Sequence, residues 1–304
     1  MADTDRARLP KELFGQIRRL EIKTRKQVEA VFSGEYHSVF KGSGMEFSEV
    51  RQYQPGDDVR SIDWNVTART GHPFLKVFDE ERELTVIMMV DASASGGFGT
   101  AERFKTEAIA ELCATIAFSA IRNGDKVGLM IFTDSIELYI PPAKGRKNVL
   151  RIIREILFFK PQGKGTDIKG ALERLNGTVK RKGIVFLLSD FDNTGGDFEK
   201  PLNAASRRHD LVAIEVFDPA ERELPDVGLI TLIDAETEEE VVVDSSNPDF
   251  RAKFAKSVAI REKGLSKLFG SHGVDHIKVP SSGSLADPLV KFFRTRERRL
   301  ARGK

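Results

Sequence analysis

The stretch Leu84–Ser95, with the sequence LTVIMMVDASAS, decides the fold of this chain. Positions 84 to 90 are apolar except for one threonine, and so continuous an apolar run predicts a strand buried on both faces of a parallel sheet. Asp91, Ser93 and Ser95 follow at alternate positions, where this strand should end. Open α/β sheets bind ligands at the carboxyl ends of their strands, where such side chains can converge on a hard cation. An Asx or Ser turn that only caps the next helix is the alternative.

Two later stretches carry further oxygen-bearing side chains. Thr166 lies in the segment GKGTD ahead of a predicted helix, and Asp190 follows the apolar run Ile184–Leu188. An Asp-x-Ser-x-Ser string after the first buried strand, a threonine in a middle loop and an aspartate after a later strand together resemble the metal-ion-dependent adhesion site of von Willebrand factor A domains. The resemblance implies a metal site formed by Asp91, Ser93, Ser95, Thr166 and Asp190.

The implied site has a mostly neutral inner shell. By the resemblance, the two serines and the threonine touch the metal, and the aspartates act mostly through water. Asp167 and Asp192 remain alternatives for the distal carboxylate. The expected ion is Mg²⁺, with Mn²⁺ or Ca²⁺ as alternatives. Mg²⁺ dehydrates reluctantly and demands near-octahedral ligands, so we expect weak occupancy in the isolated protein.

Composition excludes several classes of protein. The chain has 304 residues, 40% of them hydrophobic, and a formal net charge of only +2, which argues against a globally basic nucleic-acid binder. Cys113 is the single cysteine, so an intrachain disulfide and a cysteine zinc cluster are impossible. The sequence contains neither a signal-peptide pattern nor an apolar run of about 18 residues, so we expect a cytoplasmic protein without membrane insertion.

The order of predicted elements indicates the architecture. Strands alternate with helices after residue 84, which predicts an α/β fold with a doubly wound, mostly parallel sheet in three layers, of the Rossmann type. We expect residues 84–304 to form this domain, with a hairpin insertion near 228–244. Residues 1–83 are expected to form an N-terminal helix, at apolar positions between Leu9 and Val31, and a small β subdomain with strands at Tyr36–Phe40 and Glu46–Tyr53.

The segment from 51 to 69 is the densest polar stretch of the chain. It could be a structural lock, in which guanidinium and carboxylate groups pair around the only tryptophan. It could instead be a recognition surface, because Trp, Tyr and Arg dominate binding hot spots. The residues concerned are Arg51, Tyr53, Asp57, Asp58, Arg60, Asp63, Trp64 and Arg69.

The same segment carries a family resemblance. The string GSGMEFSEVRQYQPGDDVRSIDWNVTAR, at 42–69, followed by DASAS, resembles bacterial proteins of unknown function that are encoded beside MoxR-type AAA+ ATPases. In that family the string precedes a von Willebrand A-like domain. The resemblance implies a protein-interaction module that works with the ATPase in chaperone-like assembly or maturation of protein complexes. Gly96 stands where relatives often have methionine.

Catalysis is not expected. A haloacid dehalogenase-type phosphatase needs a second aspartate where Ser93 stands, and no P-loop lysine follows Gly96. We expect a non-enzymatic module whose metal binds an acidic residue of a protein partner, either the ATPase or its client. The alternatives are a metal-independent scaffold that binds through the segment from 51 to 69, and a metal-dependent phosphohydrolase.

Overall fold

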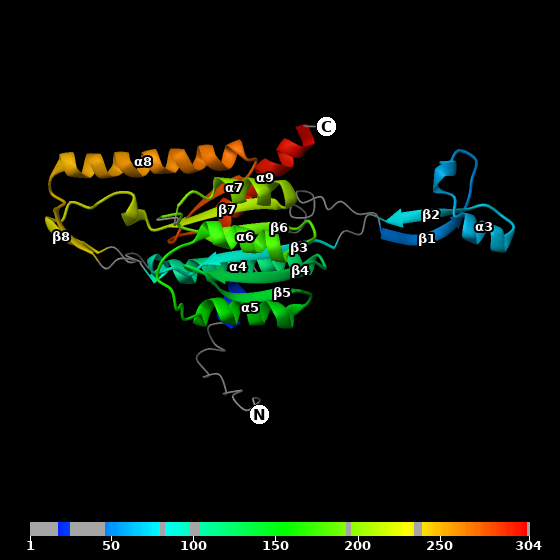
Figure 1. Cartoon of the computed structure of the whole chain (residues 1–304), viewed down its shortest axis with the longest axis horizontal. Coiled ribbons are helices and arrows are strands. Elements are labelled where there is room, and N and C mark those ends of the chain that lie inside the picture. Colours follow the sequence, from blue (N-terminus) through cyan, green and yellow to red (C-terminus); the bar gives the residue numbers. More distant parts are fainter. Residues whose placement is uncertain are drawn as a thin grey trace, which may run out of the picture. The chain divides into compact units, whose positions relative to one another are not determined.

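A computed structural model describes residues 18–24, 46–79, 83–97, 104–192, 196–233 and 239–302 (Figure 1). The chain forms two compact units. The small unit is Phe40–Leu84, and the large unit combines Met1–Val39 with Thr85–Lys304. Our expected division placed residues 1–83 together; of the first 39 residues the structure describes 18–24, which contact Glu111 and Arg146 of the large unit.

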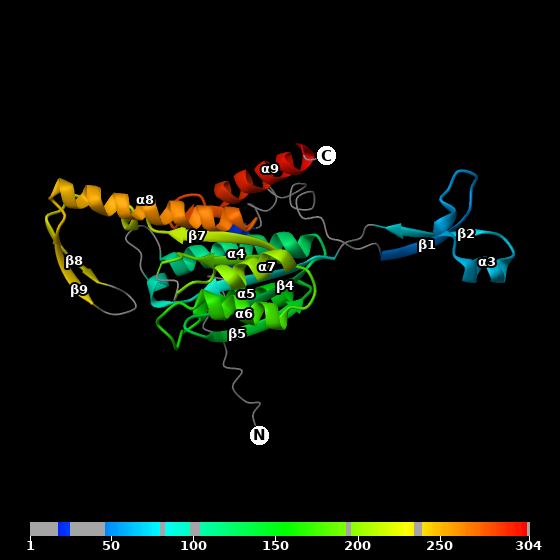
Figure 2. The same ribbon diagram turned by 45° about the horizontal axis from the view of Figure 1, so that its top comes forward.

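The large unit is built on a six-stranded sheet with β3 (Thr85–Asp91) near its centre (Figures 1 and 2). The strand order is β10-β7-β6-β3-β4-β5, and every neighbouring pair is parallel except β4 and β5. The other strands are β4 (Lys126–Phe132), β5 (Ile136–Ala143), β6 (Ile184–Ser189), β7 (Asp210–Phe217) and β10 (Asp275–Pro280). The antiparallel edge strand is β5.

Helices cover both faces of this sheet. Ile87 and Met89 of β3 belong to a core cluster with residues of α6 (Ile168–Thr178) and α7 (Glu199–Arg208). Successive strand residues point to opposite faces, so Met88 between them faces the other layer. There α4 (Lys105–Arg122) packs on α5 (Arg146–Phe158) and on β3 and β4. The expected three-layer, doubly wound α/β fold is therefore confirmed.

The chain after β7 elaborates the basic fold. The short turn η3 (Pro219–Glu221) leads to the antiparallel hairpin of β8 (Leu229–Ile233) and β9 (Glu240–Asp244). Helix α8 (Pro248–Ser271) follows, capped at its N-terminus by the Asn247 side chain, and α9 (Ala286–Arg302) packs on β10.

Residues 18–24 form the described part of the N-terminal helix. Glu21 pairs with Arg146 of α5 at 2.7 Å, and Lys23 pairs with Glu111 of α4 at 2.8 Å. These two pairs attach the helix to the large unit. The strand expected at Tyr36–Phe40 lies outside the described residues.

The small unit is held together by local hydrogen bonds. Strands β1 (Glu46–Gln52) and β2 (Phe74–Asp79) pair antiparallel, and η1 (Val59–Ser61) and α3 (Trp64–Thr70) lie between them in the chain. The Asp63 carboxylate caps α3 by accepting from Asn65 N at 2.9 Å and Val66 N at 3.3 Å. Such a cap satisfies backbone N–H groups that have no partner within the helix.

Among the described residues, one ion pair of the possible network around Trp64 is present. Arg51 makes one two-pronged pair with Asp57, at 2.8 and 2.6 Å, but Asp58 accepts from Arg60 N at 3.0 Å. Aspartates close to a turn bond to nearby backbone N–H groups, which costs less entropy than ordering a distant arginine. Within the described residues, the Arg60 side chain makes no ion pair, and Trp64 is 69% exposed.

The other members of the expected network are also outside it. Tyr53 contributes its backbone N–H, which donates to Pro73 O at 2.9 Å, and Arg69 lies exposed in the last turn of α3. The cluster is therefore one exposed ion pair and two helix caps beside exposed aromatic and cationic side chains.

These contacts predict different stability effects for two substitutions. Asp63→Ala should destabilise the small unit by about 1 kcal/mol, because it removes the α3 cap. Arg60→Ala should change its stability by less than about 0.5 kcal/mol, because the side chain is exposed. Hydrogen exchange of β1 and β2 amides measures both. A larger effect of Arg60→Ala than of Asp63→Ala would contradict this account.

A second prediction concerns His209, a buried residue at the end of α7. Burial, together with the nearby Arg208 charge, lowers the pKa of His209 from 6.5 to about 4, and its Nδ1 accepts from Gly183 N at 3.3 Å. The unfolded chain takes up a proton near pH 6.5, whereas the folded chain resists until about pH 4. Stability should therefore fall as the pH drops through this window, by up to about 3 kcal/mol.

The matched variant is His209→Asn, which cannot titrate but can present an oxygen acceptor to Gly183 N–H. Denaturant unfolding at pH 4 to 8 should show a shallower pH dependence for this variant than for the wild type. His72→Asn, at an exposed position of the small unit, should follow the wild-type curve. Parallel curves for wild type and His209→Asn would refute the assignment.

Candidate metal centre

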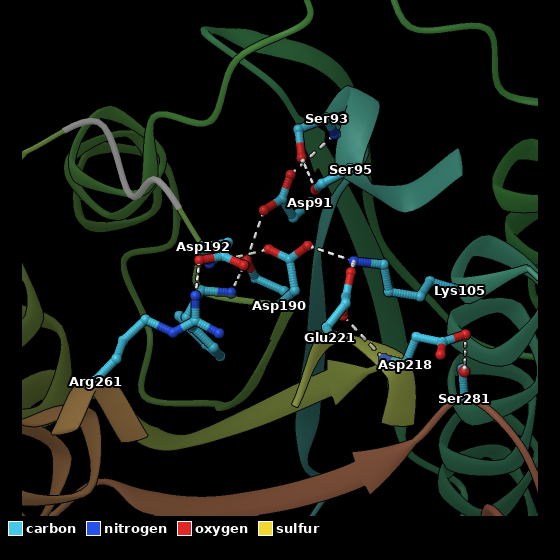
Figure 3. A network of polar contacts seen from close by, with 12 residues as sticks. Asp91, Ser93, Ser95, Lys105, Asp190, Asp192, Asp218, Glu221, Arg261 and Ser281 are labelled. Atoms are coloured by element: carbon cyan, nitrogen blue, oxygen red, sulfur yellow. Dashed lines mark hydrogen bonds and ion pairs between the residues drawn. The ribbon is translucent and has the colours of Figure 1, made fainter. Parts of the chain in front are cut away.

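The first loop of the candidate site begins where β3 ends. Asp91 is the last residue of the strand, and its Oδ1 accepts from Ser93 N at 3.0 Å. The short turn η2 (Ala94–Gly97) then brings Ser95 Oγ to 3.0 Å from Ser93 Oγ (Figure 3). Asp91 and Ser93 are buried, and Ser95 is half-buried.

The second loop follows β6, the neighbour of β3 in the sheet. Ser189 Oγ donates to Asp91 Oδ2 at 2.6 Å and accepts from Phe191 N at 2.9 Å. Asp190 is next in the chain, and its Oδ1 accepts from Asp192 N at 3.1 Å. Because β3 and β6 are parallel neighbours, their carboxyl ends bring Asp91 and Asp190 to the same edge of the sheet.

The third loop carries the buried Thr166. Lys164 O accepts from Ala94 N at 3.0 Å, which joins this loop to the first loop. The Glu137 carboxylate holds the same loop by accepting from Gln162 N and Gly163 N, each at 2.9 Å, and from Thr133 Oγ1. The structure thus brings the loops of all five expected residues to one edge.

Four of the five residues expected to form the metal site line one small cavity: Asp91, Ser93, Ser95 and Asp190. Its volume is about 10 Å³, which suits one ion or water molecule. Its polar lining consists of Asp91, Ser93, Ser95, Lys105, Ser189 and Asp190.

Two cations that we did not expect face these carboxylates. Lys105, the first residue of α4, is 1% exposed, and its Nζ lies 2.8 Å from Asp190 Oδ2 and 2.7 Å from Glu221 Oε1. Arg261 of α8 pairs with Asp192 (Figure 3). Four carboxylates, those of Asp91, Asp190, Asp192 and Glu221, therefore face two side-chain cations. The formal charge of this group is −2 when all six are ionised.

The pKa shifts in this group reflect burial first and the charges of neighbouring side chains second. Burial, and then repulsion from Asp190, raises the pKa of Asp91 to about 6. Burial also raises the pKa of Asp192, although Arg261 opposes the shift. Burial alone would lower the pKa of Lys105, but the carboxylates of Asp190 and Glu221 outweigh it and raise that pKa. Lys105 is thus charged in the folded protein.

The residues fit a small divalent cation. Neighbouring ligands of octahedral Mg²⁺ lie about 2.8–3.0 Å apart, because each is about 2.0–2.1 Å from the ion. The two serine hydroxyls are 3.0 Å apart, which is also an ordinary hydrogen-bond length, so the pair can hold together without the ion. Within the described residues, no cluster of three or more His, Cys, Asp or Glu side chains could hold a metal, so a site here depends on hydroxyl ligands.

Sequence reasoning missed Lys105, Ser189, Glu221 and Arg261 as members of this cluster. Ser189 could have been found from the sequence, because it stands between a predicted buried strand and Asp190. Lys105 and Glu221 had none, because charged residues at the start of helices and turns are usually exposed. The polar residues expected at 51–69 belong to the small unit.

The fold and the site together define an α/β protein with a hydroxyl–carboxylate set at the carboxyl edge of a mostly parallel sheet. The chain belongs to the family described as "Protein of unknown function DUF58", whose model matches residues 49–264. Among its relatives are the uncharacterised proteins Rv1480 of Mycobacterium tuberculosis and Mb1516 of Mycobacterium bovis. Each is 33% identical over 290 residues, which cover 94% of this chain and 90% of the relative.

Solved structures similar to the chain include three of low sequence identity. BatB from Bacteroides thetaiotaomicron is 15% identical with a TM-score of 0.44, over 71% of this chain and 99% of that one. The SpRpn10 VWA domain is 13% identical with a TM-score of 0.40, over 68% and 94%. Proximal thread matrix protein 1 from the mussel byssus, with a zinc-occupied MIDAS motif, is 19% identical with a TM-score of 0.36, over 44% and 38%.

A search of the described helices for a membrane span found none of sufficient length and apolarity.

The close approach at Gly163 gives a testable prediction for the third loop. A Cβ at this position would clash with Thr133 Oγ1 and lie 2.7 Å from Asp134 Oδ2, so Gly163→Ala must displace the loop or these two side chains. We expect a loss of about 1–3 kcal/mol. Gly177→Ala in α6 is the matched control, because its Cβ would meet nothing within 4 Å and alanine favours helix. Thermal unfolding of both variants tests the assignment, and equal melting temperatures would contradict it.

Proposed function

We propose that this protein is a non-enzymatic interaction module that binds a protein partner through a divalent cation at the carboxyl edge of its sheet. The supporting observation is the cluster of Asp91, Ser93, Ser95 and Asp190 around one small cavity with excess negative charge. Buried carboxylates that repel each other are costly, and a bound cation relieves that cost.

The inner ligands explain why the site would bind a partner. Ser93, Ser95 and Thr166 would hold the ion, and Asp91 and Asp190 would act mostly through water. When bound, Mg²⁺ supplies a positive centre that neutral hydroxyls leave largely unneutralised, so it attracts a further carboxylate. Ser189 keeps Asp91 oriented by its 2.6 Å hydrogen bond. The partner should therefore present an aspartate or glutamate.

The proposed partner is a MoxR-type AAA+ ATPase or its client, as the family resemblance implies. The ATPase would use its motor activity on a client complex, and this protein would provide the docking surface. The proposal places the encounter in the cytoplasm, where ATP is available. Chaperone-like assembly or maturation of protein complexes is the role that follows.

A second candidate function rests on the small unit. Trp64 is 69% exposed and Val59 is 59% exposed, and an exposed tryptophan near arginines is typical of a binding hot spot. Binding through this surface would need no metal. The two candidates make different predictions for the same measurement.

The experiment is a binding titration against a MoxR-type AAA+ ATPase of the same organism, with Mg²⁺ and with chelator. Under the metal proposal, chelator and Asp91→Ala should each weaken binding by roughly tenfold or more, because one partner carboxylate loses its ion. Trp64→Ala should then change affinity little. Ser246→Ala, at an exposed site of the large unit, is a control that should bind like wild type.

Equal affinity of wild type and Asp91→Ala, with and without chelator, would overturn the metal proposal. If Trp64→Ala then strongly weakened the affinity, the hypothesis of a metal-independent scaffold would be supported instead.

A further inference from the structure

Lys105 is the most unusual charged residue in the large unit. Its side chain is only 2% exposed, and it lies at the point where α4 begins, 85 residues from Asp190 and 116 from Glu221 in the sequence. Lysine is rarely buried unless its charge is compensated. Here two carboxylates from different elements compensate it (Figure 3).

The two partners of Lys105 differ in what else they do. The Glu221 side chain is held by a second hydrogen bond, because its Oε2 accepts from Asp218 N at 3.0 Å in a capping box. Asp218 itself accepts from Ala220 N at 2.9 Å and lies near Ser281. Asp190 lines the cavity of the candidate metal centre instead. Lys105 is therefore held in place by Glu221 while it neutralises a residue of the metal centre.

We propose that Lys105 is a built-in counter-ion that competes with the divalent cation for Asp190 and so keeps metal affinity low until a partner carboxylate arrives. This inference rests on the proposed function. A cation entering the cavity meets an ammonium group on the shared carboxylate, and like charges repel in a site with little water. Lys105 neutralises part of the negative charge that would attract the ion. A carboxylate from the partner supplies negative charge in its place. Metal and partner would then bind cooperatively.

The test compares charge-altered variants by isothermal titration with Mn²⁺. Lys105→Met keeps the length of the side chain and removes its charge, and it should tighten metal binding roughly tenfold or more. Lys105→Arg retains the positive charge, so it should not tighten metal binding. Glu221→Gln leaves Lys105 with Asp190 as its charged partner in the metal centre, so it should weaken metal binding.

Lys105→Met leaves the buried Asp190 and the half-buried Glu221 without their ammonium and could fail to fold. The double variant Lys105→Gln with Glu221→Gln removes one charge of each sign and keeps the balance. It should also bind Mn²⁺ more tightly than wild type, because Asp190 is released. A purely structural lysine would lower the melting temperature of these variants without tightening metal binding.

The outcomes separate this inference from the proposed function. If wild type binds Mn²⁺, Asp91→Ala abolishes binding, and Lys105→Met and the Lys105→Gln, Glu221→Gln double variant bind like wild type or more weakly, then the counter-ion role is wrong and the metal centre stands. If no variant binds Mn²⁺, both proposals fail. Binding by the lysine variants but not by wild type would be the strongest support for competition.

Discussion

The burial of Asp91 and Asp190 at the ends of adjacent strands is the constraint on which this structure depends. Parallel strands bring their carboxyl ends together, so the two carboxylates are adjacent whether or not their charges are balanced. The protein offsets this repulsion with Ser189, which donates to Asp91, and with Lys105, which pairs with Asp190. The same lysine joins the start of α4 to η3, because it also pairs with Glu221.

Much of the fold could be predicted because it is encoded locally. The run at 84–90 is apolar on both faces of the strand, and β3 is correspondingly buried on both. The residues of the candidate site stand directly after such strands, so finding the strands also locates Asp91 and Asp190. Because the strands are parallel, their carboxyl ends lie at one edge of the sheet even when they are distant in sequence, and this brings Asp91 and Asp190 together.

The errors and omissions have a different physical origin. Lys105 depends on contacts across 85 and 116 residues, and nothing in its neighbourhood distinguishes it from an exposed helical lysine. In the small unit the sequence supplied both arginines and backbone N–H groups as partners for the aspartates. Asp58 and Asp63 bond to N–H groups two or three residues away, where little chain entropy is lost. Composition alone cannot choose between those partners.

A weak metal site can be more useful than a tight one in an interaction module. If the ion were bound tightly by its own carboxylates, its charge would be neutralised and a partner carboxylate would gain little by approaching it. In the proposed site the hydroxyls would be the inner ligands, and Lys105 already pairs with Asp190, so the free protein would gain less from the ion than it would if both aspartates lacked a counter-charge. A partner carboxylate then contributes to both equilibria, and by linkage the ion strengthens the partner's binding as much as the partner strengthens the ion's. The buried lysine would in this way make the metal centre a conditional one, stable in the absence of the ion and completed by the partner.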